Sequence, residues 1–278
     1  MNLWRQAGTL QWRQIAKTVG RRVLADKVMN RSAELAFWFL LGFFPMLVAV
    51  AGIASVIVGG SGSQATLTSY LGKALPSSAS GLVAGILKQT TGGGRAWLSL
   101  LFALWSSSSA IPGVMTTLNV IYGIEEDRTW WKARLLALTL ALATGALLVS
   151  TLVIVVHGPE LLVAALPGTG SLWVWKIVQW PAAATLLMVA LFCLYRFAPN
   201  LKEQKWQLLI PGSILSAAIW IVASVLFKLY VRHFSNFGLL YGSLGTLIIL
   251  MFWFYLGGIA ILVGGELNTT LENATGKS

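Results

Sequence analysis

The chain has 278 residues, of which 56% are hydrophobic and 10% are charged, and its formal net charge at pH 7 is +11. Soluble domains contain about 25% charged residues, so this composition, with a mean hydropathy of +0.75, excludes an ordinary soluble domain and indicates a protein surrounded by lipid. The basic residues fall in short segments between apolar runs, so they predict membrane topology rather than a nucleic-acid partner.

Six intervals without a charged residue are long enough to cross a bilayer, because a spanning helix needs about 20 apolar residues. After trimming at turn residues, the predicted spans are 33–58, 97–122, 134–157, 174–197, 208–231 and 243–265. We therefore expect an all-α polytopic membrane protein with a six-helix transmembrane domain over 33–267. A cytoplasmic basic amphipathic segment, 1–32, precedes this domain, and a short cytoplasmic tail, 268–278, follows it.

The distribution of lysine and arginine predicts the orientation. One side of the predicted membrane domain receives 14 of the 20 basic residues, including the dense N-terminal group. Because basic loops stay in the cytoplasm, both termini are expected there.

Two segments outside the spans have helical patterns of their own. In the N-terminal segment, apolar residues lie on one side of a helical projection and basic residues lie elsewhere, as shown by Trp4, Trp12, Ile15, Val19 and Val23 against Arg13, Lys17 and Arg21. This pattern predicts either an amphipathic helix on the anionic leaflet or a basic tail that sets topology. The first extracytoplasmic loop, 59–95, predicts two short interfacial helices, with a re-entrant hairpin as the alternative.

Small residues mark three of the predicted spans. In the second span, Ser106, Ser107, Ser108, Ser109 and Pro112 predict a kink, and the serines serve either helix packing or a polar cavity. In the fifth span, a close-packing face is expected, formed by Gly212, Ser213, Ser216 and Ala217. The last span, within 242–268, combines aromatic residues with glycines, and we expect it to be the packing centre of the bundle.

Four polar residues stand at the predicted cytoplasmic boundary: Glu34, Asn119, Arg196 and Glu266. Ionisable groups at that depth are costly unless they are paired or hydrated. They are interpreted in three ways: as interfacial anchors, as a structural ion pair of Arg196 with Glu266 or Glu34, or as a vestibule that binds a charged headgroup or solute.

Several stretches of the chain resemble the YihY/BrkB family of bacterial inner-membrane proteins. They are ELAFWFLLGFFPML, LWSSSSAIPGVMTTLNVIYG, LYRFAPN and YGSLGTLIILMFWFYLGGIAILVGGELN. The matching positions include Ala36, Pro45, Asn119, Pro199, Tyr241, Gly242, Trp253, Tyr255, Gly265 and Glu266, whereas Glu34 lies outside the family pattern. The resemblance implies a bacterial inner-membrane location and a six-span fold. The family it resembles carries an old ribonuclease BN label, and some of its members are linked to virulence. The resemblance therefore also implies a role in envelope biogenesis or transport.

The residues themselves argue against the ribonuclease label. A metal-dependent nuclease needs clustered His, Asp and Glu ligands, but His157 and His233 are predicted outside, and the cytoplasmic run 125–127 has no histidine. Neither a metal, a cofactor nor a nucleotide-binding loop is expected. We therefore expect a non-enzymatic transporter or flippase-like protein for a lipid or amphiphilic envelope component. The alternative is a non-transporting scaffold in envelope assembly, and the expected partners are membrane lipids, a second copy or an envelope-assembly protein.

Overall fold

The computed structural model describes residues 12–58, 105–106, 108–165, 171–201, 205–233 and 237–275. Within these ranges the regular structure is entirely helical, which confirms the predicted all-α class. The helices are α2 (Trp12–Ala25), α3 (Val28–Val58), α7 (Ala110–Tyr122), α8 (Trp130–Ala165), α9 (Ser171–Phe197), the short 3₁₀ helix η1 (Trp206–Leu208), α10 (Leu209–His233) and α11 (Phe237–Ala274).

Three stretches among the described residues are long and apolar enough to cross a membrane: Ile177–Phe197, Trp206–Tyr230 and Leu247–Ala274. Helix α7 is apolar but shorter. Each of the six predicted spans overlaps a helix, yet the count of six membrane crossings stays a prediction. The predicted helices of the first loop lie outside the described residues.

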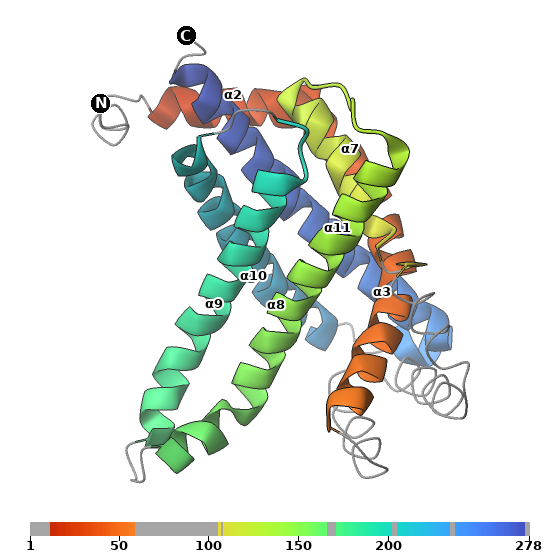
Figure 1. Ribbon diagram of the computed structural model, residues 1–278, viewed down its shortest axis with the longest axis vertical. Coiled ribbons are helices and arrows are strands. Elements are labelled where there is room, and N and C mark those ends of the chain that lie inside the picture. The colour runs from red at the N-terminus through yellow and green to blue at the C-terminus, as the bar shows by residue number, and fades with distance from the viewer. Residues whose placement is uncertain are drawn as a thin grey trace.

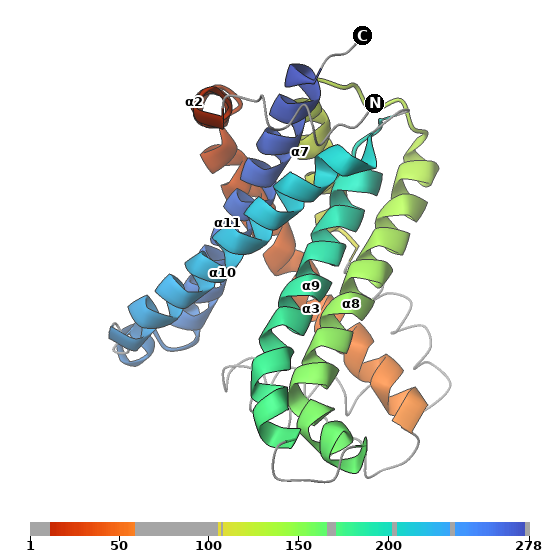
Figure 2. The same cartoon turned by 90° about the vertical axis from the view of Figure 1, so that its left-hand side faces the viewer.

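The helices converge at one end of the molecule and diverge toward the other (Figures 1 and 2). Helix α2 lies across the converged end, since it runs horizontally in Figure 1 and is seen end-on in Figure 2. Helix α11 packs against α2, α3, α7 and α10. It therefore occupies the central position that its glycine-rich sequence predicts.

Glycine allows α10 and α11 to approach closely. A Cβ on Gly264 would collide with Ser216 Oγ and lie 2.6 Å from Gly212 O, so a larger residue does not fit there. Gly212, Ser213, Ser216 and Ala217 are all buried, which confirms the predicted close-packing face of α10. Hydrogen bonds join α11 to both α9 and α10 at this contact. Tyr195 Oη donates to Ile261 O, and Ser216 Oγ donates to Ala260 O at 2.7 Å.

Helix α11 ends later than the apolar run predicts. The sequence places the end of the last span at 265 and a tail from 268, but the helix continues to Ala274. Its polar residues Glu266, Asn268, Thr269 and Thr270 are buried against neighbouring helices rather than exposed to water. Neighbouring helices cover these four polar residues, so loss of hydrophobicity does not mark the end of the helix.

The described end of the serine run is a turn that comes directly before α7. Ser108 and Ser109 form a turn, and Ser108 Oγ donates to Trp105 O at 2.7 Å. Helix α7 begins at Ala110, so Pro112 lies in its first turn, where the missing N–H leaves no hydrogen bond unmade. The described part of the chain thus has a helix start where the sequence predicts a proline kink, while Ser107 lies outside the described residues.

Candidate functional site: a polar junction at the converged end

Glu266 is the most deeply buried acidic group among the described residues of the converged end. Its side chain on α11 is 0% exposed, and its Oε2 accepts a hydrogen bond from Arg22 Nε at 2.8 Å. The other carboxylate oxygen, Oε1, has no hydrogen-bond partner among the described residues. A buried carboxylate requires a compensating charge, and Arg22 of α2 supplies it.

Arg22 joins three helices through one guanidinium group. Besides binding Glu266, its Nη2 donates to Ile121 O at 2.7 Å, in the last turn of α7. The unpaired carbonyls at a helix C-terminus carry partial negative charge, so they favour a cation at this position. Asp26 is a more distant third acceptor, with its Oδ2 4.0 Å from Nη2. We call the contacts of Arg22 with Glu266 and Ile121 the polar junction.

Apolar packing holds α2 in place beside the polar junction. Ile15 and Val19 are buried against Leu271 of α11, and Leu208 and Leu267 pack at the edge of this cluster. The amphipathic pattern in the sequence is therefore used to dock α2 on protein. The basic side chains of α2 at positions 13, 17 and 21 remain exposed.

Asn119 belongs to a second polar cluster at the C-terminal end of α7. Its Nδ2 donates to Glu126 Oε2 at 2.7 Å, and its Oδ1 accepts from the backbone N–H of Asn200 at 2.8 Å. Arg128 completes the cluster by donating to the carbonyls of Ala198 and Pro199. These bonds fasten the α7–α8 connection to the segment after α9, which is a structural arrangement.

Arg196 and Glu34 occupy separate surroundings. The Arg196 guanidinium lies over the rings of Trp206 and Phe197, at 5.6 Å and 5.8 Å from their centroids. The Glu34 side chain is exposed on α3. The ion pair of Arg196 with Glu266 or Glu34, which is one of the three interpretations, is absent from the described residues, where Glu266 pairs with Arg22 instead.

The sequence contained a signal for Arg22 that the sequence interpretation missed. Arg22 follows Ile15 by seven residues, which places it on the apolar side of the helical projection. A cation on the buried side of an amphipathic helix needs an acidic partner, and this requirement would have drawn attention to it.

The family-pattern residues mostly serve helix packing in the described chain. Trp253 packs edge-to-face on Trp220 of α10, with ring centroids 5.6 Å apart. Tyr255 Oη contacts Met29 Sδ at 3.4 Å, and a Cβ on Gly265 would lie 3.0 Å from Leu118. Pro199 is fully buried, Pro45 lies within α3, and Tyr241 and Gly242 belong to the first turns of α11.

The long apolar helices are those of an integral membrane protein. A family profile described as "Virulence factor BrkB" matches residues 19–278, so the chain belongs to the BrkB family. This finding agrees with the family resemblance of the sequence.

Two relatives are similar to this chain over most of its length. The chain is 34% identical over 263 residues to the "Putative ribonuclease-like protein YfkH" of Bacillus subtilis, covering 92% of this chain and 94% of that protein. It is 25% identical over 272 residues to a "UPF0761 membrane protein" of Pseudomonas aeruginosa, covering 94% of this chain and 63% of that protein. The chain thus spans somewhat less than two thirds of the Pseudomonas relative. No solved structure matches.

The family is a membrane family and not an established enzyme family. The name of the Bacillus relative refers to a ribonuclease, but the described residues of this chain contain no group of three His, Cys, Asp or Glu side chains placed to hold a metal ion. The ribonuclease-like name therefore has no support in the site chemistry of the described part.

Proposed function

We propose that this protein transports or flips a lipid or amphiphilic envelope component across the bacterial inner membrane without hydrolysing a nucleotide. The observation that carries the proposal is the ion pair of Arg22 with the fully buried Glu266 at the converged end. A buried ion pair contributes little net stability compared with apolar packing. An ionisable group within a membrane helix is by default a candidate for function.

The arrangement of the helices supports a gate at the polar junction. The helices converge where Arg22 ties α2 to α7 and α11, and they diverge away from it (Figures 1 and 2). A transporter that alternates access needs one closed end whose contacts can be exchanged for others. The polar junction provides such contacts, because its two bonds depend on a single side chain.

The proposed orientation places the polar junction at the cytoplasmic side. The basic residues of the chain concentrate on the side that carries α2, and the positive-inside rule assigns such segments to the cytoplasm. In the proposed transport cycle, the arrangement seen here is therefore the state that is closed toward the cytoplasm.

Reconstitution in liposomes tests the proposal. We expect Glu266→Gln to fold with normal yield, because glutamine still accepts a hydrogen bond from Arg22, but to lose most of the flux of fluorescent phospholipid or solute. Glu34→Gln is the matched control, since Glu34 is an exposed acid on α3. If Glu266→Gln leaves both lipid scrambling and solute flux at the wild-type rate, Glu266 is not a transport residue.

A scaffold in envelope assembly is the second candidate. It is favoured by the large apolar surface of the spanning helices, since only 17–28% of their most apolar stretches is buried inside the described structure. Lipid or another membrane protein covers such a surface. A scaffold predicts a partner, or a second copy, that co-purifies in mild detergent at fixed stoichiometry. A monomer without a partner that still catalyses flux would exclude this alternative.

A further inference from the structure

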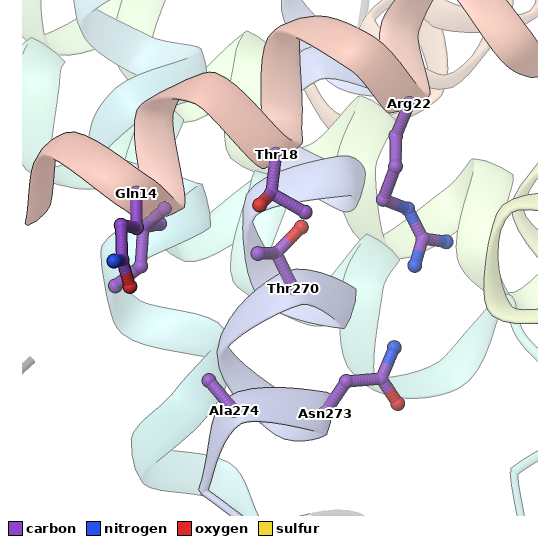
Figure 3. Close-up of a pocket in the computed structure, with 7 residues that line it drawn as sticks. Gln14, Thr18, Arg22, Thr270, Asn273 and Ala274 are labelled. Atoms are coloured by element: carbon purple, nitrogen blue, oxygen red, sulfur yellow. The ribbon is translucent and has the colours of Figure 1, made fainter. Parts of the chain in front are cut away.

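A pocket of about 340 Å³ lies between α2 and the last two turns of α11, beside the polar junction (Figure 3). Gln14, Thr18 and Arg22 line it from α2, and Thr270 and Asn273 line it from α11. The acid Glu266 is not among the lining residues. The pocket is therefore a separate feature, which shares only the Arg22 side chain with the polar junction.

The spacing of the lining residues builds two facing polar surfaces. Gln14, Thr18 and Arg22 are four residues apart, so they form one stripe along α2, adjacent to the apolar stripe that docks the helix. Thr270 and Asn273 are three residues apart on α11. Figure 3 shows Thr18 and Thr270 facing each other across the gap between the two helices.

One buried polar group beside the pocket, the Thr270 hydroxyl, lacks a hydrogen-bond partner among the described residues. The Thr270 side chain is 6% exposed. Buried hydroxyl groups nearly always have a partner, because leaving one unsatisfied costs about 1–3 kcal/mol. A ligand oxygen between Thr18 and Thr270 would satisfy both hydroxyls.

The surrounding charge favours an anion. Arg22 already neutralises Glu266, so further positive charge must come from elsewhere. Lys17 and Arg21 supply it. Arg21 follows Gln14 by seven residues and therefore points to the same side of α2, and Lys17 lies next to it on the helical projection. Both side chains are exposed, and neither forms an ion pair with another described residue.

The position of the pocket matches the depth of lipid headgroups. Helix α2 lies across the converged end of helices that are long enough to span a membrane (Figures 1 and 2). A helix in this orientation, with basic residues exposed, lies at the level of the membrane surface. Phosphate groups of lipids are found at that level.

We propose that this pocket binds a phosphate-bearing group. The hydroxyls of Thr18 and Thr270 and the guanidinium of Arg22 contact the phosphate oxygens, and Lys17 and Arg21 provide the excess positive charge at the rim. The group is carried by a phospholipid headgroup or by a small soluble phosphate, since both present the same oxygens. Binding does not require transport, so this inference stands or falls independently of the proposed function.

Titration calorimetry on the full chain in a neutral maltoside detergent tests this site. The probes are dihexanoyl phosphatidylglycerol and inorganic phosphate, with dihexanoylglycerol as the control that lacks phosphate. We expect the double variant Thr18→Val, Thr270→Val to bind at least about tenfold more weakly, because it loses two hydrogen bonds to a charged group. The matched control is Thr139→Val, Thr185→Val, which changes two exposed threonines that bond to their own helix carbonyls.

The two phosphate probes identify the source. Binding of both supports recognition of the phosphate group itself, binding of the lipid alone assigns a phospholipid headgroup, and binding of inorganic phosphate alone assigns a soluble ligand. The double variant Thr18→Ser, Thr270→Ser keeps both hydroxyls and is expected to retain binding, which separates lost contacts from lost folding. The proposal is overturned if neither probe binds, if dihexanoylglycerol binds equally well, or if the valine variant binds like the wild type.

Discussion

The Arg22–Glu266 pair leads to a prediction for stability. Arg22→Met keeps the apolar stem of the side chain but removes the cation 2.8 Å from a carboxylate that is 0% exposed. At that separation, an effective dielectric constant of about 20 gives a gross attraction of about 6 kcal/mol. Breaking a buried pair by removing one partner costs about 3–5 kcal/mol. Because the Arg22 side chain is 27% exposed and partly screened by water, we expect a loss near the lower limit, about 3 kcal/mol.

Thermal unfolding in detergent, followed by tryptophan fluorescence, measures this loss. A change of about 3 kcal/mol lowers the unfolding midpoint by on the order of 10 °C in a chain of this size. The double variant Arg22→Met, Glu266→Gln contains no unpaired buried charge, so it is expected to recover much of the loss. Arg21→Met, an exposed neighbour on α2, is the control. The reasoning is refuted if Arg22→Met unfolds at the wild-type temperature, or if the double variant is no more stable than Arg22→Met.

Two further substitutions test the packing of the converged end in the same unfolding assay. Gly264→Ala places a Cβ 2.6 Å from the Gly212 carbonyl, and we expect it to lower the free energy of unfolding by about 3 kcal/mol. Its control, Gly20→Ala, meets nothing within 4 Å and should be neutral or stabilising by up to about 1 kcal/mol. Equal midpoints for these two variants would contradict the close approach of α10 and α11. Asn119→Ala leaves the backbone N–H of Asn200 without its acceptor, and we expect it to lower the free energy of unfolding by about 2 kcal/mol. Hydrogen exchange of that amide should also become faster. Unchanged exchange would exclude the hydrogen bond.

The sequence predicts the helices well because hydrophobicity is a local property. A run of apolar residues must form a helix in lipid, where every backbone group has to be satisfied within the segment. The same argument fails at the end of α11. Thr269 Oγ1 donates to Gly265 O within the helix, and Asn268 Oδ1 accepts from Gly212 N of α10 at 2.9 Å, so polar residues continue the helix inside protein. Only the tertiary structure reveals that these residues face neighbouring helices.

The sequence likewise predicts one part of the candidate site and not the other. Glu266 could be selected from the sequence because an acid at the end of a long apolar, closely packing helix is unusual. Its partner could not be selected by proximity, since Arg22 is 244 positions away and the chain contains 20 basic residues. Arg196 is predicted near the same membrane boundary, yet it packs on Trp206. The choice between the two arginines is made by the docking of α2, which depends on apolar contacts of Ile15 and Val19.

Arg22 belongs both to the polar junction and to the proposed phosphate pocket. This side chain holds Glu266 on one side and lines the pocket on the other, so an anion in the pocket and the carboxylate of Glu266 share one guanidinium. If the anion binds as proposed, it weakens the hold of Arg22 on Glu266, and by linkage an intact polar junction weakens binding of the anion to the same extent. Arg22→Met must then reduce both stability and binding, while the valine variant at Thr18 and Thr270 reduces binding alone. The polar junction and the pocket would thus act as one coupled device, in which a phosphate group at the membrane surface loosens the contacts that close this end of the bundle.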